Sequence, residues 1–447
     1  MGRLFGTDGV RGIANVELSC ELALSIGRAI GHIFNGKENR TSVLIGSDTR
    51  ISGDMLTSAL TSGLCSMGVN VICLGTVSTP CVAYLVRALS ANAGIMVSAS
   101  HNPSEYNGIK IFGSDGYKLP DALEDMIESI VLEPSKHISL TADTVGRCRV
   151  LYDSVNMYSE YLKGTVNEDF GGLKVALDCA NGSASVSAPN IFTELGADVT
   201  VLSSEPDGFN INASCGSTHV EALRDAVVKN SLDVGFAFDG DADRCLCIDE
   251  RGELVDGDQI LAMCSLDLKI RGKLKNNTVV GTVMSNFGFN KFCEENSISF
   301  LATKVGDRYV LEEMLLGDFV IGGEQSGHII FSDFATTGDG QLTALQVLSL
   351  MNRSGKKLSE LKSVMKKYPQ ELINVSVSAE GKLRFYNDLD VQSAIKDAEN
   401  VLAGEGRILV RPSGTEPLIR VMTEGSDKPL ITSLAKKVAE KIAEKLS

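Results

Sequence analysis

Three stretches of the chain repeat the same order of apolar and polar positions. Each begins with an apolar run, continues through a short polar loop and a helical segment, and ends with a second apolar run. In chain order, the first runs are 43–46, 174–178 and 279–284, the helical segments are 54–67, 186–195 and 288–296, and the second runs are 69–74, 197–202 and 298–302. This order is typical of a βαβ unit, which implies parallel strands. The pattern therefore predicts an α/β fold with three related α/β domains and mixed, mostly parallel sheets.

The last part of the chain follows a different pattern, without the βαβ order. It predicts strands over 372–378, 407–410 and 418–422, and helices over 389–402 and 428–446. The closing helix has apolar residues at helical spacing (Leu430, Leu434, Val438 and Ile442). We therefore expect a C-terminal α+β domain. The expected domains are 1–152, 153–253, 254–367 and 368–447.

Length and charge limit the kinds of function. The chain has 447 residues, 43% of them hydrophobic, which is enough for several cores. Its formal net charge of −15 disfavours nucleic acid and anionic membranes as partners. No apolar run approaches the roughly 18 residues of a membrane span, and the first residues do not resemble a signal segment. We therefore expect a cytoplasmic protein that binds neither nucleic acid nor membrane.

Cysteines and familiar motifs exclude further classes. The 11 cysteines include no C-x-x-C pair and sit mostly in apolar runs, so we expect reduced, buried thiols. The sequence contains no P-loop, no G-x-G-x-x-G after a strand and no G-x-S-x-G. Nucleotide hydrolysis, dinucleotide binding and lipase-like hydrolysis therefore lose their usual support.

An acidic loop gives the strongest metal signal. Three carboxylates, Asp239, Asp241 and Asp243, alternate with small residues that leave room for a loop around one hard cation. The spacing through Glu250 also fits a calcium EF-hand, but Arg244 stands where that loop needs Gly, and strand-like runs flank it. A solvated acidic turn is the plainer alternative. We favour a catalytic Mg²⁺ site at a strand end.

A serine follows another predicted strand. Ser100, His101 and Pro103 lie in a turn after the apolar run 94–97, and Lys110 follows shortly after. We expect Ser100 to be exposed and held in place by this turn. An adjacent histidine is a weak candidate base, and a structural turn is the alternative. Beside a metal loop, however, a seryl hydroxyl can carry a phosphoryl group.

Two glycine loops could bind a phosphorylated sugar. Between two strands of the last domain, Arg411 offers a bidentate fork, and Ser413, Gly414 and Thr415 offer hydroxyls and backbone N–H groups. The segment 322–328 places Glu324, Ser326 and His328 on alternate positions, where one face of an extended loop could meet sugar hydroxyls. An ordinary glycine turn is the alternative for each.

Together, and in this order, the four loops resemble the α-D-phosphohexomutase superfamily over essentially the whole chain. Within it, the segments 5–12 and 411–417 and the residue Gln325 resemble the phosphoglucosamine mutase family. Phosphomannomutase/phosphoglucomutase enzymes typically have Met at the Gln325 position. They remain the alternative.

The resemblance implies a fold, a reaction and a set of residues. It implies four domains around a central cleft, and interconversion of glucosamine 6-phosphate and glucosamine 1-phosphate through a 1,6-bisphosphate, on the route to UDP-N-acetylglucosamine. It is compatible with a homodimer. The implied roles are phosphoserine for Ser100, Mg²⁺ binding for Asp239, Asp241 and Asp243 with Ser100, sugar contacts for Glu324, Ser326 and His328, phosphate binding for Arg411, Ser413, Gly414 and Thr415, and phosphate or acid/base roles for Arg11, Lys110 and Arg244.

Lys110 could move the hydroxyl proton if burial or neighbouring cations lower its pKa. A metal-dependent phosphatase, a sugar-phosphate sensor and a calcium-binding module are the other readings. A sensor or a calcium module has no need of a phosphate acceptor, so the serine loop argues against both.

Overall fold

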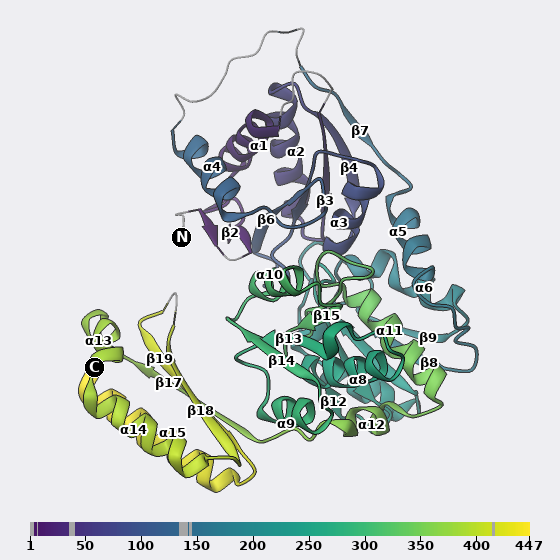
Figure 1. Ribbon diagram of the computed structural model, residues 1–447. Helices are drawn as coiled ribbons and strands as arrows, with labels where there is room; N and C mark the ends of the chain where they lie inside the picture. The colour runs from purple at the N-terminus through teal and green to yellow at the C-terminus, as the bar shows by residue number, and fades with distance from the viewer. Residues whose placement is uncertain (1–3, 7, 35–40, 134–141, 143–144, 414–415) are drawn as a thin grey trace. The chain divides into compact units, whose positions relative to one another are not determined.

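The computed structural model describes the whole chain except residues 1–3, 7, 35–40, 134–141, 143–144 and 414–415 (Figure 1). The chain divides into two compact units. The first comprises Met1–Met284 and Ile298–Val364, and the second comprises Ser285–Ser297 and Met365–Ser447. The segment around 285–297, which the sequence pattern assigns to the third α/β domain, therefore groups with the last part of the chain.

The first sheet of the first unit has seven strands in the order β1-β2-β6-β5-β3-β4-β7. The strands are β1 (Phe5–Gly6), β2 (Gly9–Ile13), β3 (Ser42–Ser47), β4 (Asn70–Thr76), β5 (Ala93–Val97), β6 (Tyr106–Gly113) and β7 (Cys148–Val150). β3 pairs in parallel with β4 and β5, whereas β6 is antiparallel to β5 and β2. The antiparallel β6 begins beside the end of β5, where the serine turn connects the two strands, and runs back toward the start of β5.

Helices cover both faces of this sheet. The helices α1 (Cys20–Phe34), α2 (Ser52–Ser66) and α4 (Asp121–Leu132) share one apolar core with Val43, Ile45 and Ile95 of the sheet (Figure 1). The helix α3 (Thr79–Ala88) packs on β3 and β5. It lies so close that a Cβ at Gly94 would stand 2.4 Å from Val86 Cγ2, which explains a glycine in the middle of a buried strand.

Two further sheets complete the first unit. One has the order β12-β11-β10-β8-β9 and the other the order β14-β13-β15-β16. Their strands are β8 (Lys174–Asp178), β9 (Asp198–Leu202), β10 (Val234–Phe238), β11 (Cys245–Asp249), β12 (Leu254–Val255), β13 (Thr278–Thr282), β14 (Ser299–Thr303), β15 (Ile321–Gly323) and β16 (Ile329–Phe331). Their helices are α5 (Ser154–Lys163), α6 (Ala188–Glu194), α7 (Glu221–Lys229), α8 (Gly257–Ile270), α10 (Asp307–Gly317), α11 (Gly340–Ser354) and α12 (Leu358–Leu361).

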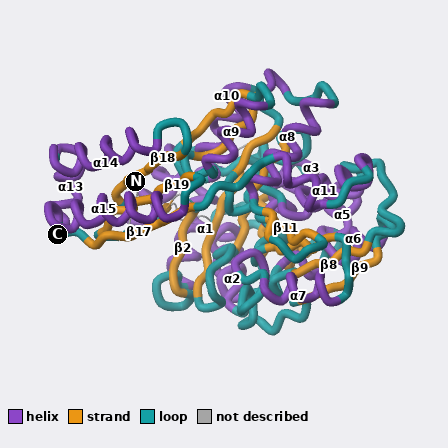
Figure 2. Tube along the Cα trace, turned by 90° about the horizontal axis from the view of Figure 1, so that it is seen from below, coloured by secondary structure: helices purple, strands orange, loops and turns teal. Residues whose placement is uncertain are grey.

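The second unit is an antiparallel sheet with helices packed on it. Its strands β17 (Gln370–Ser376), β19 (Leu418–Gly425) and β18 (Gly406–Pro412) lie in that order. The helices α14 (Leu389–Leu402) and α15 (Lys428–Leu446) run side by side and bury one apolar core with the sheet (Figures 1 and 2). The unit also contains α9 (Phe287–Glu295) and α13 (Ala379–Arg384).

A buried carboxylate fixes α9 in this unit. Glu424 accepts hydrogen bonds from Asn286 Nδ2 at 3.0 Å and from the backbone N–H of Phe287 at 3.1 Å, and it pairs with Arg407 Nε at 2.6 Å. Arg407 also donates to the carbonyl of Ser285. The start of α9 is therefore bound to β18 and β19 by charge-assisted hydrogen bonds.

The predicted fold class is confirmed: mixed α/β sheets are followed by an α+β unit. The parallel pairs β3/β4, β8/β9 and β13/β14 correspond to the three repeated patterns. The expected helix over 186–195 is present but shorter, as α6 (Ala188–Glu194), because Ser183–Val186 form a 3-10 turn before it.

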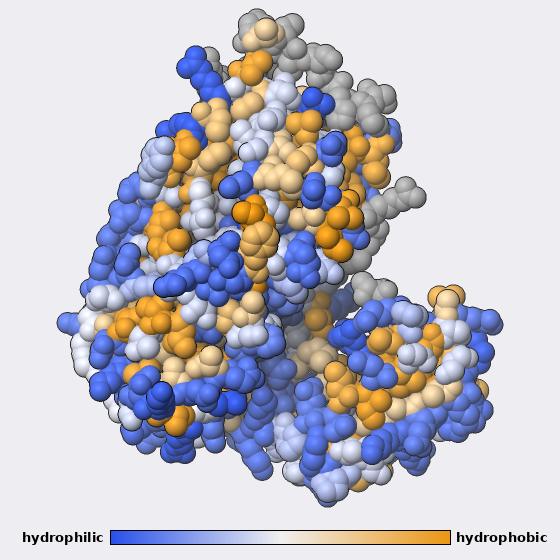
Figure 3. Space-filling view, turned by 180° about the vertical axis from the view of Figure 1, so that it is seen from behind, coloured by the Kyte–Doolittle hydropathy of each residue, from blue (hydrophilic) through white to orange (hydrophobic). Residues whose placement is uncertain are grey.

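The surface, the helices and the thiols can be compared with the expectations that the protein binds no membrane and has reduced, buried cysteines. Hydrophilic residues cover most of the face in Figure 3, with hydrophobic residues in separate patches. Across the described ranges, the longest and most apolar helices still fall short of a membrane span. All eleven thiols are free and seven are buried, but Cys20, Cys65 and Cys73 are half-buried, and Cys148 is exposed on the edge strand β7.

Candidate active site

The acidic loop connects β10 to β11. The carboxylates of Asp239, Asp241 and Asp243 are buried, and one ligand atom from each lies within 4.8 Å of the others. An EF-hand needs helices on both sides of its loop, and here strands flank it, so the EF-hand reading is wrong.

The charges in this loop fit a hard divalent cation. The Oδ1 atoms of Asp241 and Asp243 are buried and have no hydrogen-bond partner within the described part of the chain. Burial, with the neighbouring Asp243 and Asp241, raises the pKa of Asp239 well above its ordinary value. Three converging carboxylates with open oxygens are the donor set that Mg²⁺ or Ca²⁺ takes.

Ser100 lies beside this loop. Its Oγ donates a hydrogen bond to Asp239 Oδ2 at 2.7 Å. The expected exposure is wrong, because Ser100 is only 1% exposed. The reason is that Gly240 and Asn212, from the loops around β10, cover the serine turn: Asn212 Nδ2 lies 2.9 Å from the Ser100 carbonyl oxygen.

The neighbouring histidine is close to the serine but neutral. Nδ1 of His101 lies 3.4 Å from Ser100 Oγ. Burial, followed by the nearby charges of Arg244 and Arg11, lowers the pKa of His101 to about 4. The ring is therefore uncharged at neutral pH and would hold a proton there only weakly.

A buried ion pair beneath the serine turn was missed by the sequence reasoning. Asp48 and Arg50 follow β3, are both fully buried and pair at 2.9 Å. Asp48 Oδ2 accepts the hydroxyl of Ser98 at 2.6 Å, and the guanidinium of Arg50 donates to the Ser100 carbonyl at 3.0 Å. The available signal was the polar loop 47–50 after an apolar strand, where α/β folds place ligand-site residues.

Lys110 comes from β6 and reaches into the acidic loop. Its Nζ lies 2.8 Å from Asp241 Oδ2, 3.3 Å from Asp243 Oδ2 and 3.3 Å from Asp8 Oδ2. Burial opposes its charge, but Asp241, Asp8 and Asp243 outweigh burial and raise the pKa of Lys110 well above its ordinary value. The lowered pKa that a general base would need is therefore absent.

The two predicted arginines also meet carboxylates. Arg11 Nη2 pairs with Asp8, and Arg244 Nε lies 3.8 Å from both Asp239 Oδ2 and Asp243 Oδ1. Nε of each arginine is buried without a hydrogen-bond partner among the described residues. These open donors suit an anionic ligand such as phosphate.

A cavity of about 520 Å³ opens over these groups. Arg11, Asp243, Arg244, Glu324 and His328 line it, together with the segment 305–307. Two of the predicted basic residues, one carboxylate of the metal loop and two residues of the sugar loop thus meet at one cavity. Ser100 does not line the cavity and is connected to the acidic loop through its hydrogen bond to Asp239.

The sugar loop is a tight turn between β15 and β16, and not the expected extended loop. The backbone N–H of Gly327 donates to the carbonyl of Glu324 at 3.0 Å, which closes the turn. Ser326 is exposed at its tip, whereas His328 is buried. The three side chains therefore do not share one face.

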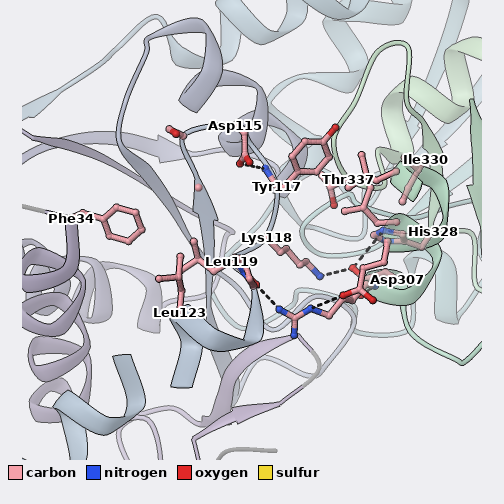
Figure 4. Close-up of a pocket in the computed structure, with 17 residues that line it drawn as sticks. Phe34, Asp115, Tyr117, Lys118, Leu119, Leu123, Asp307, His328, Ile330 and Thr337 are labelled. Carbon is pink, nitrogen blue, oxygen red and sulfur yellow. Dashed lines mark hydrogen bonds and ion pairs between the residues drawn. The ribbon is translucent and has the colours of Figure 1, made fainter. Parts of the chain in front are cut away.

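His328 lies beside a set of charged side chains that the sequence did not reveal, and its Nε2 accepts a hydrogen bond from the backbone N–H of Gly338 at 3.1 Å. Lys118 pairs with Asp8 at 2.5 Å and with Asp307, and Asp307 Oδ2 lies 3.7 Å from His328 Nε2 (Figure 4). His328 Nδ1 lies 3.7 Å from Asp243 Oδ2. A second cavity of about 460 Å³, lined largely by apolar side chains, adjoins Lys118, Asp307 and His328 (Figure 4).

The expected phosphate loop lies in the second unit, between β18 and β19. Arg411 and Ser413 are described, and Gly414 and Thr415 lie outside the described residues. Arg411 stands directly opposite Arg420 across the two strands. Burial and Arg420 lower the pKa of Arg411. Like charges on opposed strand positions are unfavourable unless an anion offsets them.

Comparisons with known proteins agree along the chain. Domains I, II, III and IV (the C-terminal domain) of the phosphoglucomutase/phosphomannomutase family match residues 2–137, 155–252, 256–368 and 372–441. Phosphoglucosamine mutases of Thermoanaerobacter sp. and Acetivibrio thermocellus are each 53% identical to this chain over 447 and 448 residues, with 100% of both chains covered.

Solved structures share the fold at low identity. A phosphoglucomutase/phosphomannomutase family protein from Burkholderia thailandensis has a TM-score of 0.85 at 23% identity, covering 99% of this chain and 97% of that one. An N-acetylphosphoglucosamine mutase from Aspergillus fumigatus, solved with GlcNAc-6P and magnesium, has a TM-score of 0.68 at 17% identity, covering 99% and 96%. Four consecutive family domains and full-length relatives at more than half identity establish that the chain belongs to the phosphoglucomutase/phosphomannomutase family.

Proposed function

We propose that the chain is an isomerase that interconverts glucosamine 6-phosphate and glucosamine 1-phosphate through a phosphoserine at Ser100. Its full-length relatives at 53% identity are phosphoglucosamine mutases. The observation that carries the mechanism is the Ser100 hydroxyl, held 2.7 Å from Asp239 in a buried carboxylate triad. This is the arrangement that a seryl phosphoryl carrier beside a divalent cation requires.

In the proposal, Asp239, Asp241 and Asp243 hold Mg²⁺ together with an oxygen of phosphoserine. When bound, Mg²⁺ neutralises charge on the phosphoryl oxygens. The chain's own cations add to this. Arg11, Lys110 and Arg244 offset the three carboxylates and the nearly −2 charge of phosphoserine.

The reaction runs in two balanced halves. In the first half, the P–O bond to Ser100 Oγ breaks while a P–O bond to the free substrate hydroxyl forms, and the proton that this hydroxyl loses is returned to Ser100 Oγ. The resulting 1,6-bisphosphate reorients without leaving the site, so that its other phosphoryl group faces Ser100. In the second half, the P–O bond between the substrate and its other phosphoryl group breaks while a P–O bond to Ser100 Oγ forms, and the proton that Ser100 Oγ loses is returned to the substrate oxygen that is released.

This reorientation requires a second binding site, which holds the phosphate that is not being transferred. We assign that site to Arg411, Ser413, Gly414 and Thr415. The opposed Arg411 and Arg420 support an anion site there. Glu324, Ser326 and His328 are assigned to the sugar, which the position of Glu324 and His328 in the cavity wall supports.

A coupled assay tests the proposal directly. Purified wild type should equilibrate glucosamine 6-phosphate and glucosamine 1-phosphate in the presence of Mg²⁺ and lose activity in EDTA. Ser100→Ala should be inactive with an unchanged Tm. Full isomerase activity in Ser100→Ala would remove the phosphoserine from the mechanism.

A phosphomannomutase or phosphoglucomutase is the second candidate. Gln325 is the position that separates the two by resemblance, and its Nε2 lies 3.5 Å from Asp256 Oδ2 at the edge of the sugar turn. We expect kcat/KM to favour glucosamine phosphate over glucose and mannose phosphates. The reverse order would favour the second candidate, and release of free phosphate without isomerisation would favour a phosphatase.

A further inference from the structure

The peptide carbonyl of Ser100 is bound from two sides. The Arg50 guanidinium donates to it through Nη2 at 3.0 Å, and the Asn212 side-chain amide donates to it at 2.9 Å. Arg50 follows β3 of the first sheet, and Asn212 lies in the loop between β9 and β10 of the second. One backbone oxygen at the reacting residue thus ties two sheets together.

Arg50 contacts more of the serine turn than this one oxygen. It donates to the carbonyls of Asn102 at 2.7 Å and Tyr106 at 2.9 Å, and also to that of Pro103. Its partner Asp48 accepts the hydroxyl of Ser98. A buried guanidinium with four carbonyl acceptors and one carboxylate therefore sets the path of the turn.

Asn212 supports the same turn from the opposite side. Its amide also donates to the Asn102 carbonyl at 3.1 Å, and its backbone N–H donates to Ala180 at 2.8 Å. Gly240 approaches so closely that a Cβ there would lie 2.6 Å from the Ser100 carbonyl oxygen. These contacts to the Ser100 carbonyl therefore have space only because residue 240 is glycine.

The turn needs an external support because Ser100 is strained. Its φ of 54° lies in the left-handed region, which is unfavourable for a residue other than glycine. Without contacts that over-determine it, the backbone would relax and move the seryl oxygen.

The hydroxyl cannot supply this support throughout the reaction. In the free enzyme Ser100 Oγ donates to Asp239, but an esterified oxygen has no proton to donate. The phosphoryl group also adds a charge of nearly −2 beside the three carboxylates, so the electrostatic surroundings of the seryl oxygen differ between the two states. The carbonyl contacts are independent of the ester and remain in both states.

We propose that Arg50 and Asn212 are positioning residues that clamp the Ser100 carbonyl, so that the seryl oxygen keeps its place in both the free and the phosphorylated enzyme. The proposal rests on the phosphoserine function proposed above. It assigns neither residue a contact with substrate. Their effect is on kcat, because a misplacement of about 1 Å at the reacting atom can cost roughly 100-fold in rate.

The test compares Arg50→Lys, Asn212→Ala and the double variant. Lysine keeps the positive charge beside Asp48, but its ammonium group cannot donate hydrogen bonds to four carbonyls as the guanidinium of Arg50 does. We expect each single variant to lower kcat at least 10-fold while KM changes less than 2-fold. Both residues donate to the same carbonyl oxygen of Ser100. The fold-loss of kcat in the double variant should therefore be smaller than the product of the fold-losses in the two single variants.

Arg353→Lys is the matched control. Arg353 pairs with Glu168 and Asp267 near the far end of α11, about 20 Å along the helix axis from Gly340, whose N–H contacts the acidic loop at Ala242. Its kcat should match wild type. Equal kcat in wild type, Arg50→Lys and Asn212→Ala would overturn the proposal, as would a loss confined to KM.

A second measurement separates this inference from the proposed function. Each variant is incubated with glucose 1,6-bisphosphate, and phosphate uptake at Ser100 is followed by mass spectrometry. Slower uptake in Arg50→Lys supports the clamp even if wild type does not isomerise glucosamine phosphates. If Arg50→Lys does not fold, the Asn212→Ala rates decide: a wild-type uptake rate there overturns the clamp.

Discussion

Burial and neighbouring charge together set the properties of single side chains in this site. Lys110 is almost fully buried, which alone would favour its neutral form, yet three carboxylates keep it charged. His101 has less compensation and stays neutral. The residue that resembles a base by its position is therefore a fixed cation.

Replacing Lys110 with Met should lower kcat roughly 100-fold, because an electrostatic partner of the transferring group is lost. The pH profile of the remaining activity should keep its shape, since Lys110 does not titrate near neutral pH. Steady-state rates between pH 6 and 9 check this. A lost basic or acidic limb would instead identify Lys110 as the proton carrier. Lys163→Met, at an exposed ion pair, is the control.

Residues within contiguous loops could be found from the sequence, and residues that meet across long separations could not. Asp239, Asp241 and Asp243 form one visible pattern. Asp8, Lys118 and Asp307 come from three distant segments and carry no local motif. The exposure of Ser100 was mispredicted for the same reason, since Asn212 stands 112 positions away.

The hairpin of β18 and β19 carries an unusual pair at the element scale. Arg411 and Arg420 are opposed, and Arg420 is paired with Glu416 at 2.9 Å. A hairpin with two opposed guanidinium groups is suited to an anion, and its stability should depend on ionic strength.

Arg411→Gln should raise KM for glucosamine 6-phosphate about 10- to 100-fold, as expected for one charge-assisted hydrogen bond to phosphate, with a smaller change in kcat. The Tm should not fall, because a like-charge contact is removed. Steady-state kinetics and thermal unfolding check both parts. Arg384→Gln, an exposed residue of α13, should change neither. A lower Tm with unchanged KM would give Arg411 a structural role only.

A buried carboxylate at the start of α11 should make the stability of the folded state depend on pH. Asp339 caps this helix through the N–H of Leu342, and its Oδ2 accepts the Tyr158 hydroxyl at 2.6 Å. Burial raises the pKa of Asp339 to about 6. The folded state therefore binds more protons than the unfolded state between about pH 4 and pH 6.

Stability from this group should therefore decline as the pH rises through that window, by about 3 kcal/mol in total. Asp339→Asn keeps the capping oxygen and removes the titration. The Tm of wild type should fall relative to that of the variant from pH 5 to pH 7. A constant difference would contradict the assignment. The same change at Asp427, the exposed N-cap of α15, provides the control.

Elements with strong periodicity were predicted closely from sequence. The helices over 389–402 and 428–446 have the expected bounds, because their apolar faces repeat regularly. The turn at 324–327 was mispredicted as extended, since alternation within a seven-residue segment does not distinguish a strand from a hairpin turn. Pairing between strands, which decides this, is not local.

At the scale of the whole molecule, we expect the acidic loop to couple folding to cation binding. Mg²⁺ at 100 times its Kd should stabilise the protein by about 2.7 kcal/mol and raise the Tm by a few degrees. Asp239→Asn should abolish this response. Without Mg²⁺ its Tm should equal or exceed that of wild type, because the pKa of Asp239 is raised and its charge is unfavourable.

Thermal unfolding with Mg²⁺, with EDTA and with Ca²⁺ checks this prediction. A full Mg²⁺ response in Asp239→Asn would contradict a site at this loop.

The order of the four loops predicted the family from sequence, but the grouping of 285–297 with the last domain could not be predicted from it. That grouping depends on Glu424, which lies 138 positions beyond Asn286.

This separation has a consequence for synthesis. At about 5–20 residues per second, α9 leaves the ribosome roughly 7–30 s before the strand that carries Glu424. During that interval Asn286 and the first N–H groups of α9 lack their carboxylate. A ribosome-bound chain ending near residue 400 should thus be more open to protease at 285–297 than the finished protein.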